Sequence, residues 1–378
     1  MKVYHQAILP SGFKASGLSS GIKKSGKPDL ALFYSLLSAK ASGLFTANKI
    51  AAAPVVLCKS YLKKNKDFRA IIVNSGNANC FNGKAGLSDA QKTADALAKY
   101  LKIKKDAVLV GSTGIIGKRL PYFKIKQAMP DLVQKLSARG IMQAKKAILT
   151  TDKFTKEVTV KFNLGNSLVT ICGIAKGAGM IAPDMATMLG FIFCDASITQ
   201  RALDSSLKIA AADSFNCITV DGCMSTNDSL IILANGASKN RIIDKGKSLA
   251  LFQQALKFVC LELAKMIVRD GEGATKFITI KVKQARNYQQ AKKAALAVAN
   301  SSLFKTAVYG KDPNFGRVVA SVGASGVDVD EKTLKIKLGP LNKKDVQVEI
   351  SLGQGGSECT VYTSDLTPEY IKINAAYN

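Results

Sequence analysis

Thr187 closes a segment whose residue types could support chemistry on the backbone: Lys176-Gly-Ala-Gly-Met-Ile-Ala-Pro-Asp-Met-Ala-Thr187. Its two glycines permit backbone angles that other residues rarely adopt, whereas Pro183 fixes its own φ and biases the preceding residue towards an extended conformation. A hydroxyl placed after such a turn can attack the preceding carbonyl, here that of Ala186, and hydrolysis of the resulting ester releases a new N-terminal threonine. The segment is a candidate for self-cleavage, and an ordinary strand entry is the alternative.

Histidine is almost absent, since the sequence contains only His5, close to the N-terminus. Ser-His-Asp and Cys-His catalysis need a histidine held by the core, and histidine-ligated metal sites need the same. We therefore expect no metal site, and the predicted reaction uses no other cofactor. An acyl-transfer enzyme of this composition would take its general base from a lysine, a carboxylate or a free α-amine. The α-amine titrates near neutral pH, at about 7.7–8.0, and a cleaved Thr187 would supply one.

A second glycine-rich stretch, Gly111-Ser-Thr-Gly-Ile-Ile-Gly117, follows an apolar run at 107–110. Its spacing matches the loose phosphate loop of dinucleotide-binding proteins, which would predict an NAD-dependent oxidoreductase. Pro121 resists a following helix, and no acidic residue stands at a strand end about 20 residues later. A glycine loop that points backbone N–H groups into a pocket can instead form an oxyanion hole. A plain tight turn is the remaining interpretation.

Glu272 stands between two glycines in Arg269-Asp-Gly-Glu-Gly-Ala-Thr275, at the end of an amphipathic run. The glycines fit a helix C-cap followed by a turn. A carboxylate held this close to the backbone could orient an amine, and a solvated turn is the alternative.

The net charge is +27, from 54 Lys+Arg against 27 Asp+Glu. Such a surplus is compatible with nucleic-acid binding, but the cations are spread along the whole chain rather than gathered in one arm or stripe. We expect no nucleic-acid partner, and a positive electrostatic field that favours anionic substrates.

The eight cysteines show no regular spacing that would indicate disulfide pairs, and no apolar run is long enough to cross a membrane. The N-terminus lacks the apolar core of a signal peptide, so we expect a cytoplasmic protein with reduced thiols.

Short apolar runs alternate with amphipathic segments along the chain. The predicted strands are 70–73, 107–110, 157–163, 167–174, 188–194, 217–220, 229–233 and 276–282, with more strands and glycine turns after 308. The predicted helices are 88–101 and 197–214, each opened by a capping box, and 123–149, 249–269 and 287–302. Several strands follow one another as hairpins, which favours an α+β fold over a doubly wound parallel sheet. A composition change near residue 283 predicts a catalytic core at 1–282 and a smaller α+β domain at 283–378.

Beyond these segments, a series of motifs is similar to the ornithine acetyltransferase family, the glutamate N-acetyltransferases of cyclic arginine biosynthesis. The resemblance covers essentially the whole chain. Its landmarks are Ser16-Gly-Leu-Ser-Ser-Gly21, Val73-Asn-Ser-Gly-Asn-Ala-Asn79, Ser112-Thr-Gly-Ile-Ile-Gly117, Thr150-Thr-Asp152, Lys176 to Gly190, Ser225-Thr-Asn-Asp228, Arg269 to Thr275, Asp312-Pro-Asn-Phe-Gly-Arg317 and Ile373-Asn-Ala375. The run Pro183-Asp-Met-Ala-Thr-Met-Leu-Gly190 is the most specific of them.

The resemblance implies a layered α/β sandwich core and self-cleavage between Ala186 and Thr187, giving an alpha chain 1–186 and a beta chain 187–378. It implies a ping-pong reaction in which Thr187 takes acetyl from N-acetylornithine and passes it to glutamate. It also implies an oxyanion hole at Thr113 and Gly114, and substrate contacts from Thr150, Lys176, Thr187, Glu272 and Asn374. A heterotetramer of two alpha and two beta chains follows by analogy, while the use of acetyl-CoA as a donor stays open. The alternative within the same chemistry is an amidase or aminopeptidase with water as acceptor.

Three positions depart from the family pattern. The chain stops at Tyr377-Asn378, where family members usually continue to a further Thr or Ser that contacts substrate. Cys223-Met224 stands where Asp-Thr is more usual, and Phe315 replaces a frequent Trp. The first two departures bear on substrate binding and the third on packing.

Overall fold

The structure, a computed structural model, describes residues 1–182 and 188–376. The predicted cleavage point at Ala186 and Thr187 lies outside the described residues. The strands are β1 Lys2–Tyr4, β2 Phe13–Leu18, β3 Leu30–Phe45, β4 Phe68–Asn77, β5 Val108–Ile115, β6 Lys156–Leu164, β7 Ser167–Lys176, β8 Leu189–Cys194, β9 Ser229–Ala234, β10 Phe277–Ala285, β11 Lys335–Leu338, β12 Asp345–Ser351 and β13 Ser357–Ser364. The α-helices are α1 Ala53–Lys64, α2 Gly83–Leu101, α3 Tyr122–Gln134, α4 Ile141–Ala147, α5 Gln200–Ala212, α6 Gly246–Arg269, α7 Tyr288–Ala299, α8 Ser302–Gly310, α9 Gly316–Gly323 and α10 Pro368–Ala375. Short 3-10 turns lie at η1 Lys105–Ala107, η2 Ala138–Gly140 and η3 Phe215–Cys217.

The larger sheet is mixed and is joined through the long strand β3. Its order is β1-β6-β7-β8-β9-β3-β4-β5, with β2 paired to the first half of β3. That first half pairs antiparallel with β2 and β4, whereas its second half, Lys40–Phe45, pairs antiparallel with β9. β4 with β5 and β8 with β9 are parallel, and the other pairs are antiparallel. The fold is therefore α+β, as the sequence predicts.

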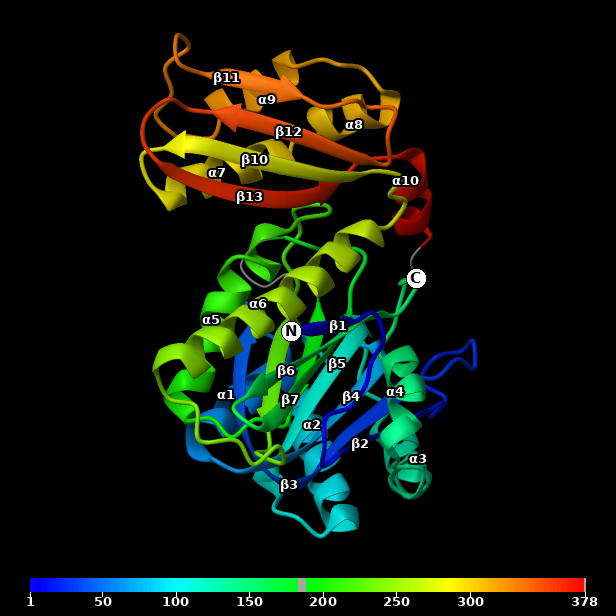
Figure 1. The fold of residues 1–378 in the computed structure, drawn as a ribbon. Helices are drawn as coiled ribbons and strands as arrows, with labels where there is room; N and C mark the ends of the chain where they lie inside the picture. Colours follow the sequence, from blue (N-terminus) through cyan, green and yellow to red (C-terminus); the bar gives the residue numbers. More distant parts are fainter. Residues whose placement is uncertain (183–187, 377–378) are drawn as a thin grey trace.

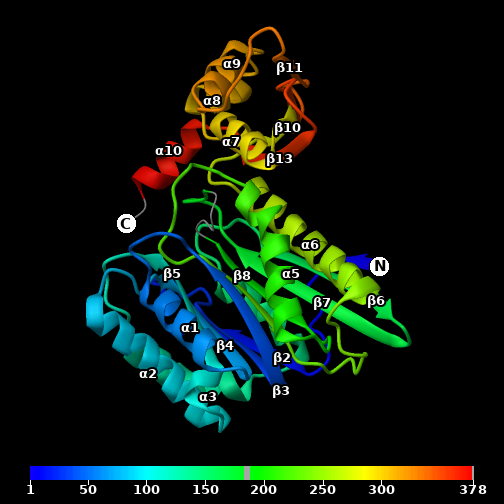
Figure 2. The ribbon, with the colours of Figure 1, turned by 90° about the vertical axis from the view of Figure 1, so that its left-hand side faces the viewer.

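Bending at β3 stacks the two halves of this sheet face to face. Successive side chains of β8 point to opposite faces of the sheet. Phe191 and Phe193 pack in the core formed with β2–β5, whereas Ile192 and Cys194 pack in the core under α5 and α6. The Phe33 ring lies 5.6 Å from that of Phe191 and 5.0 Å from that of Phe193, which joins the two halves. Figure 2 shows α1–α3 on one side of the sheets and α5 and α6 on the other. This is a layered α/β sandwich.

A second, smaller sheet has the order β11-β12-β10-β13 and its own core with α7, α8 and α9. It lies above the larger sheet, beyond the C-terminal end of α6 (Figure 1). The last helix, α10, returns from this sheet towards the larger unit (Figures 1 and 2). The division predicted at 282/283 falls inside β10, whose residues pair with β12 and β13 on both sides of that point. The division into domains stays a prediction.

The hairpin of β6 and β7 is confirmed, with Leu164 paired to Ser167 across a turn in which Gly165 has φ of 60°. The strand predicted at 217–220 is wrong. Only Ile218 forms an isolated bridge, to Tyr362, because the backbone of Val220 donates instead to Ile181 O at 2.9 Å. Within residues 1–182 and 188–376, the helices are too short or too polar to cross a membrane.

Candidate functional site

A cavity of about 110 Å³ gathers the predicted site residues from five separate parts of the chain. Its lining includes Thr113, Gly114, Thr150, Lys176, Glu272 and Asn374. Thr187 lies outside the described residues, but Met188, the next residue, immediately precedes β8. β8 pairs with β7 so that Leu189 faces Lys176. The structure thus brings together every predicted site residue that it describes.

Thr113 and Gly114 lie at the end of β5, where β5 runs parallel to β4. Gly114 has φ of 133°, and a Cβ added there would lie 2.4 Å from the carbonyl carbon of Gly76. Only glycine allows this close approach of two strand ends, which leaves the Thr113–Gly114 backbone at the cavity. The dinucleotide interpretation loses its structural basis, because β5 continues to Ile115 and α3 begins only at Tyr122.

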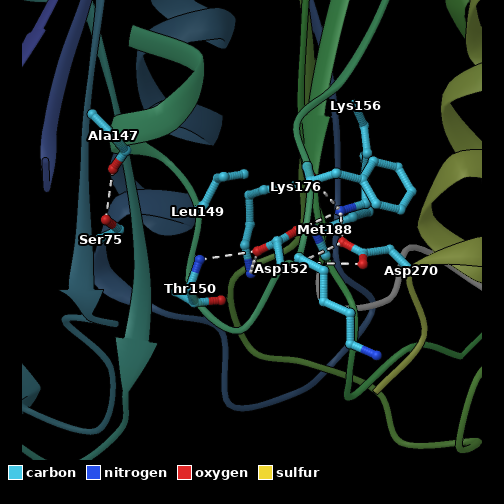
Figure 3. A network of polar contacts seen from close by, with 12 residues as sticks. Ser75, Ala147, Leu149, Thr150, Asp152, Lys156, Lys176, Met188 and Asp270 are labelled. Carbon is cyan, nitrogen blue, oxygen red and sulfur yellow. Dashed lines mark hydrogen bonds and ion pairs between the residues drawn. The ribbon is translucent and has the colours of Figure 1, made fainter. Parts of the chain in front are cut away.

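A network of buried charges joins Asp152, Lys156 and Asp270 close to Lys176 (Figure 3). Asp152 accepts hydrogen bonds from Lys156 Nζ at 2.7 Å, Gly177 N at 2.6 Å and Thr150 N at 2.9 Å. Lys156 Nζ also donates to Asp270, and the side chains of Lys156 and Asp270 are both fully buried. The two carboxylates compensate a lysine that the core would otherwise not tolerate.

Asp152 also lies 3.8 Å from Lys176 Nζ, which reaches the cavity. Burial alone would raise the pKa of Asp152, but Lys176 and Lys156 more than offset it and hold the pKa well below its usual range. For Lys176 the main effect is burial, which lowers its pKa, and Asp152 opposes the shift. Among the described residues, Asp152 is the only ion-pair partner of Lys176. An anionic group of a ligand in the cavity would add a second negative charge beside Lys176 and favour its protonated form.

Glu272 presents the opposite charge to the same cavity. It follows the C-cap of α6, and its Oε2 accepts a hydrogen bond from Asn374 Nδ2 of α10 at 3.0 Å. A Cβ added at Gly179 would lie 2.2 Å from that same oxygen, so Gly179 leaves the space in which the carboxylate sits. One ammonium and one carboxylate in a small cavity are complementary to a ligand that carries both charges.

Sequence reasoning assigned no role to several residues that support the site. Asp152 and Asp270 lie in recognised motifs, but nothing in local spacing shows that both converge on Lys156, which is 114 positions from Asp270. Lys23 was also missed, and its Nζ donates to Leu149 O at 2.7 Å, next to Thr150. Burial is the main cause that lowers the pKa of Lys23 to about 8, and the carboxylate of Asp29 opposes it. Motif membership was the available signal for Asp152 and Asp270.

The ArgJ family model matches residues 14–343 and 339–378. The arginine biosynthesis bifunctional protein ArgJ of Caldanaerobacter subterraneus is 42% identical over 98% of this chain and 97% of its own length. The protein of the same name from Geobacter sulfurreducens is 44% identical over 97% of this chain and 98% of its own length. A solved ornithine acetyltransferase complexed with ornithine, from Mycobacterium tuberculosis, aligns over 48% of this chain and 97% of its own, with 38% identity and a TM-score of 0.45.

Proposed function

Because the chain belongs to the ArgJ family, we propose that it is a self-cleaving acetyltransferase that moves acetyl from N-acetylornithine to glutamate through an acetyl ester on Thr187. The chain is an acyltransferase of arginine biosynthesis. One observation carries the finer proposal: residues from five distant segments converge on a cavity whose lining includes both a lysine and a glutamate.

The first step is cleavage of the chain's own backbone. Thr187 Oγ attacks the carbonyl carbon of Ala186, the bond from that carbon to the Thr187 nitrogen breaks, and the nitrogen takes up a proton. Water then hydrolyses the ester, which leaves a carboxylate on Ala186 and a free hydroxyl and amine on Thr187. The products are chains 1–186 and 187–378.

In the transfer itself, the Thr187 amine accepts the proton of Oγ as Oγ attacks the acetyl carbonyl. Thr113 and Gly114, at the end of β5, line the cavity and would stabilise the oxyanion, each donor being worth roughly 10²–10³ in rate. Ornithine leaves with a proton on its nitrogen, and the acetyl ester remains on Thr187. The amine of glutamate then attacks that ester and regenerates the hydroxyl.

Charge complementarity orients the donor. N-acetylornithine carries a carboxylate and, at its far end, an ammonium group. Lys176 would pair with the carboxylate and Glu272 with the ammonium, while Thr150 and Asn374 supply polar contacts at the cavity wall. Cys223 and Met224 are not among the cavity's lining residues, although Ser225 is.

Intact-mass analysis under denaturing conditions tests the cleavage. We expect two chains that divide between Ala186 and Thr187. A single uncut chain of 40.2 kDa, in a sample with Thr187 intact, would overturn the self-cleavage proposal.

The acceptor decides between a transferase and an amidase of the same N-terminal threonine chemistry. We expect steady-state release of ornithine from N-acetylornithine to rise with glutamate concentration and to saturate. A rate of ornithine release that does not change with glutamate concentration would establish water as the acceptor.

Acetyl-CoA as a second donor is part of the proposal. Its test is the release of the CoA thiol, which should depend on glutamate in the absence of N-acetylornithine. We also propose a cytoplasmic heterotetramer of two alpha and two beta chains, which light scattering on the cleaved protein would test.

Gly179→Ala is expected to raise KM for N-acetylornithine by about tenfold or more, since a displaced Glu272 carboxylate loses a charge-assisted contact. The reason is the 2.2 Å that separates an added Cβ from Glu272 Oε2. Steady-state kinetics on fully cleaved protein measures the change. Gly310→Ala is the matched control, because a Cβ there meets open space. Equal KM values in the two variants would contradict the role of Glu272.

A further inference from the structure

Asp228 belongs to the motif Ser225-Thr-Asn-Asp228, which the proposed reaction does not use. It immediately precedes β9 and is fully buried. Its Oδ1 accepts a hydrogen bond from Met188 N at 2.9 Å. Met188 directly follows Thr187 in the chain, so this buried carboxyl holds the first backbone N–H after the proposed nucleophile.

The carboxyl is poorly compensated in its charged form. Among the described residues, Asp228 Oδ2 has no hydrogen-bond partner. Burial raises the pKa of Asp228 well above its usual range, against the smaller opposing effects of the Met188 N–H, of Lys176 and of the Thr46 side chain. The Thr46 hydroxyl donates its hydrogen to Ser225 O at 2.7 Å, so it leaves Asp228 Oδ2 without a donor. The shift is towards the neutral acid, and in either protonation state a carboxyl oxygen can accept from Met188 N–H, as the oxygen of an amide would.

Both backbone groups of Met188 are fixed by the same short segment. While Asp228 accepts from its N–H, the backbone N–H of Ser229 donates to its carbonyl at 3.1 Å. Met188 follows the proposed nucleophile directly in the sequence, so these two hydrogen bonds fix the first described residue after it.

The chain before the proposed cleavage point is also hydrogen-bonded to residues near Asp228 in the sequence. Ile181 O accepts hydrogen bonds from Val220 N at 2.9 Å and Thr219 Oγ1 at 3.0 Å. Residues 219–229 thus form hydrogen bonds with Ile181, before the proposed cleavage point, and with Met188, after it. Nucleophilic attack on a neighbouring carbonyl depends strongly on geometry, and a misplacement of about 1 Å can cost about 10²-fold in rate.

We propose that Asp228 is a positioning residue for the Thr187 nucleophile, acting through its hydrogen bond with the Met188 N–H. It serves first the attack on Ala186 and then the attack on the acetyl donor. The inference rests on the proposed function, because it needs Thr187 to be the nucleophile. It requires an acceptor atom at this place and not a negative charge.

Asp195 provides a matched control at the opposite end of β8. It is also buried, and its carboxylate accepts hydrogen bonds from Thr170 N at 2.7 Å and Ser11 N at 3.2 Å. Burial likewise raises its pKa. A purely structural effect of removing a buried carboxyl next to an end of β8 should appear equally at Asp195 and Asp228.

The experiment times cleavage of the full chain after cell-free synthesis, by intact mass, for Asp228→Asn, Asp228→Ala, Asp195→Asn and Asp195→Ala. We expect Asp228→Asn to cleave within about threefold of the unchanged chain, and Asp228→Ala to cleave about tenfold or more slowly. Both Asp195 variants should cleave at the unchanged rate, even where thermal unfolding shows a loss of stability similar to that in the Asp228 variants. In cleaved Asp228→Ala, kcat should fall while KM for N-acetylornithine stays the same.

Rapid cleavage of Asp228→Ala would overturn the inference, and so would an Asp228→Asn that is as slow as Asp228→Ala. If the alanine variant does not fold, an Asp228→Asn that cleaves about tenfold or more slowly than the unchanged chain overturns the inference on its own. An unchanged chain that never cleaves would instead overturn the proposed function itself, which keeps the two failures distinct.

Discussion

Thr187→Ala is expected to leave the chain full length and to lower acetyl transfer by at least about 10³-fold. The substitution removes the Oγ that attacks Ala186 and, because the chain stays uncut, it also prevents the free amine from forming. Nucleophile and general base are therefore lost together. Denaturing mass analysis reads the first effect, and release of ornithine from N-acetylornithine in the presence of glutamate reads the second.

Thr187→Ser is the matched variant, since it keeps the hydroxyl and removes only a methyl group. We expect it to cleave at the same bond and to keep turnover within about tenfold of the unchanged protein. An alanine variant that still transfers acetyl would refute Thr187 as the nucleophile. An alanine variant that is inactive but cleaved would place the backbone chemistry on another residue.

The main elements of the larger sheet could be predicted from local patterns. The apolar run at 188–194 needs cover on both faces, and β8 is buried along its whole length between two cores. The hairpin of β6 and β7 follows from two alternating runs across a glycine turn. These patterns state which faces are buried, but not which strands become neighbours.

Helix starts were less predictable because tertiary contacts compete with local capping signals. The capping box at Ser88 predicted a start there, but α2 begins at Gly83. The earlier turn is held in place by a hydrogen bond from Asn79 Nδ2 to Gly86 O at 2.9 Å, a contact that local spacing does not reveal. At α5 the cap is Thr199, which accepts from Ala202 N, and not Ser197 two residues earlier.

The candidate site shows the same limit. Family-like motifs predicted Lys176 and Glu272, and strand pairing and the turn after α6 bring both to one cavity. The support behind them was not predictable, because Asp152 and Asp270 meet at Lys156 only after β6 and α6 have packed. Likewise, the contact of Asp228 with Met188 depends on β8 and β9 lying in parallel register.

Asp152→Ala is expected to lower the free energy of unfolding by about 3–5 kcal/mol, the usual cost of removing one partner from a buried ion pair. Asp152 and Lys156 both have fully buried side chains, and Lys176 is 3% exposed, so the substitution leaves two buried ammonium groups with less compensation. Urea unfolding measures the change. The Thr187→Ala chain is the right background, because an uncut chain does not dissociate into two chains as it unfolds.

Asp328→Ala is the control for this change, because its ion pair with Arg286 is exposed, at 70% and 61%. A surface pair of this kind contributes at most about 1 kcal/mol. Equal losses in the two variants would contradict the assignment of Asp152 as the carboxylate that compensates Lys156 and Lys176.

The pH dependence of stability offers a second measure of the same carboxylate. Its pKa in the folded protein is held below the unfolded value of about 3.9, so the folded state binds fewer protons here than the unfolded state. Asp152 therefore stabilises the fold above that pH, and its contribution is lost progressively as the pH falls below about 4. On the uncut background, unfolding free energy should fall more steeply between about pH 4 and pH 2 with Asp152 than with Asp152→Asn. The same slope in both chains would mean that Lys156 and Lys176 do not depend on the charge of Asp152, and would leave Asp270 as the residue that holds Lys156 in the core.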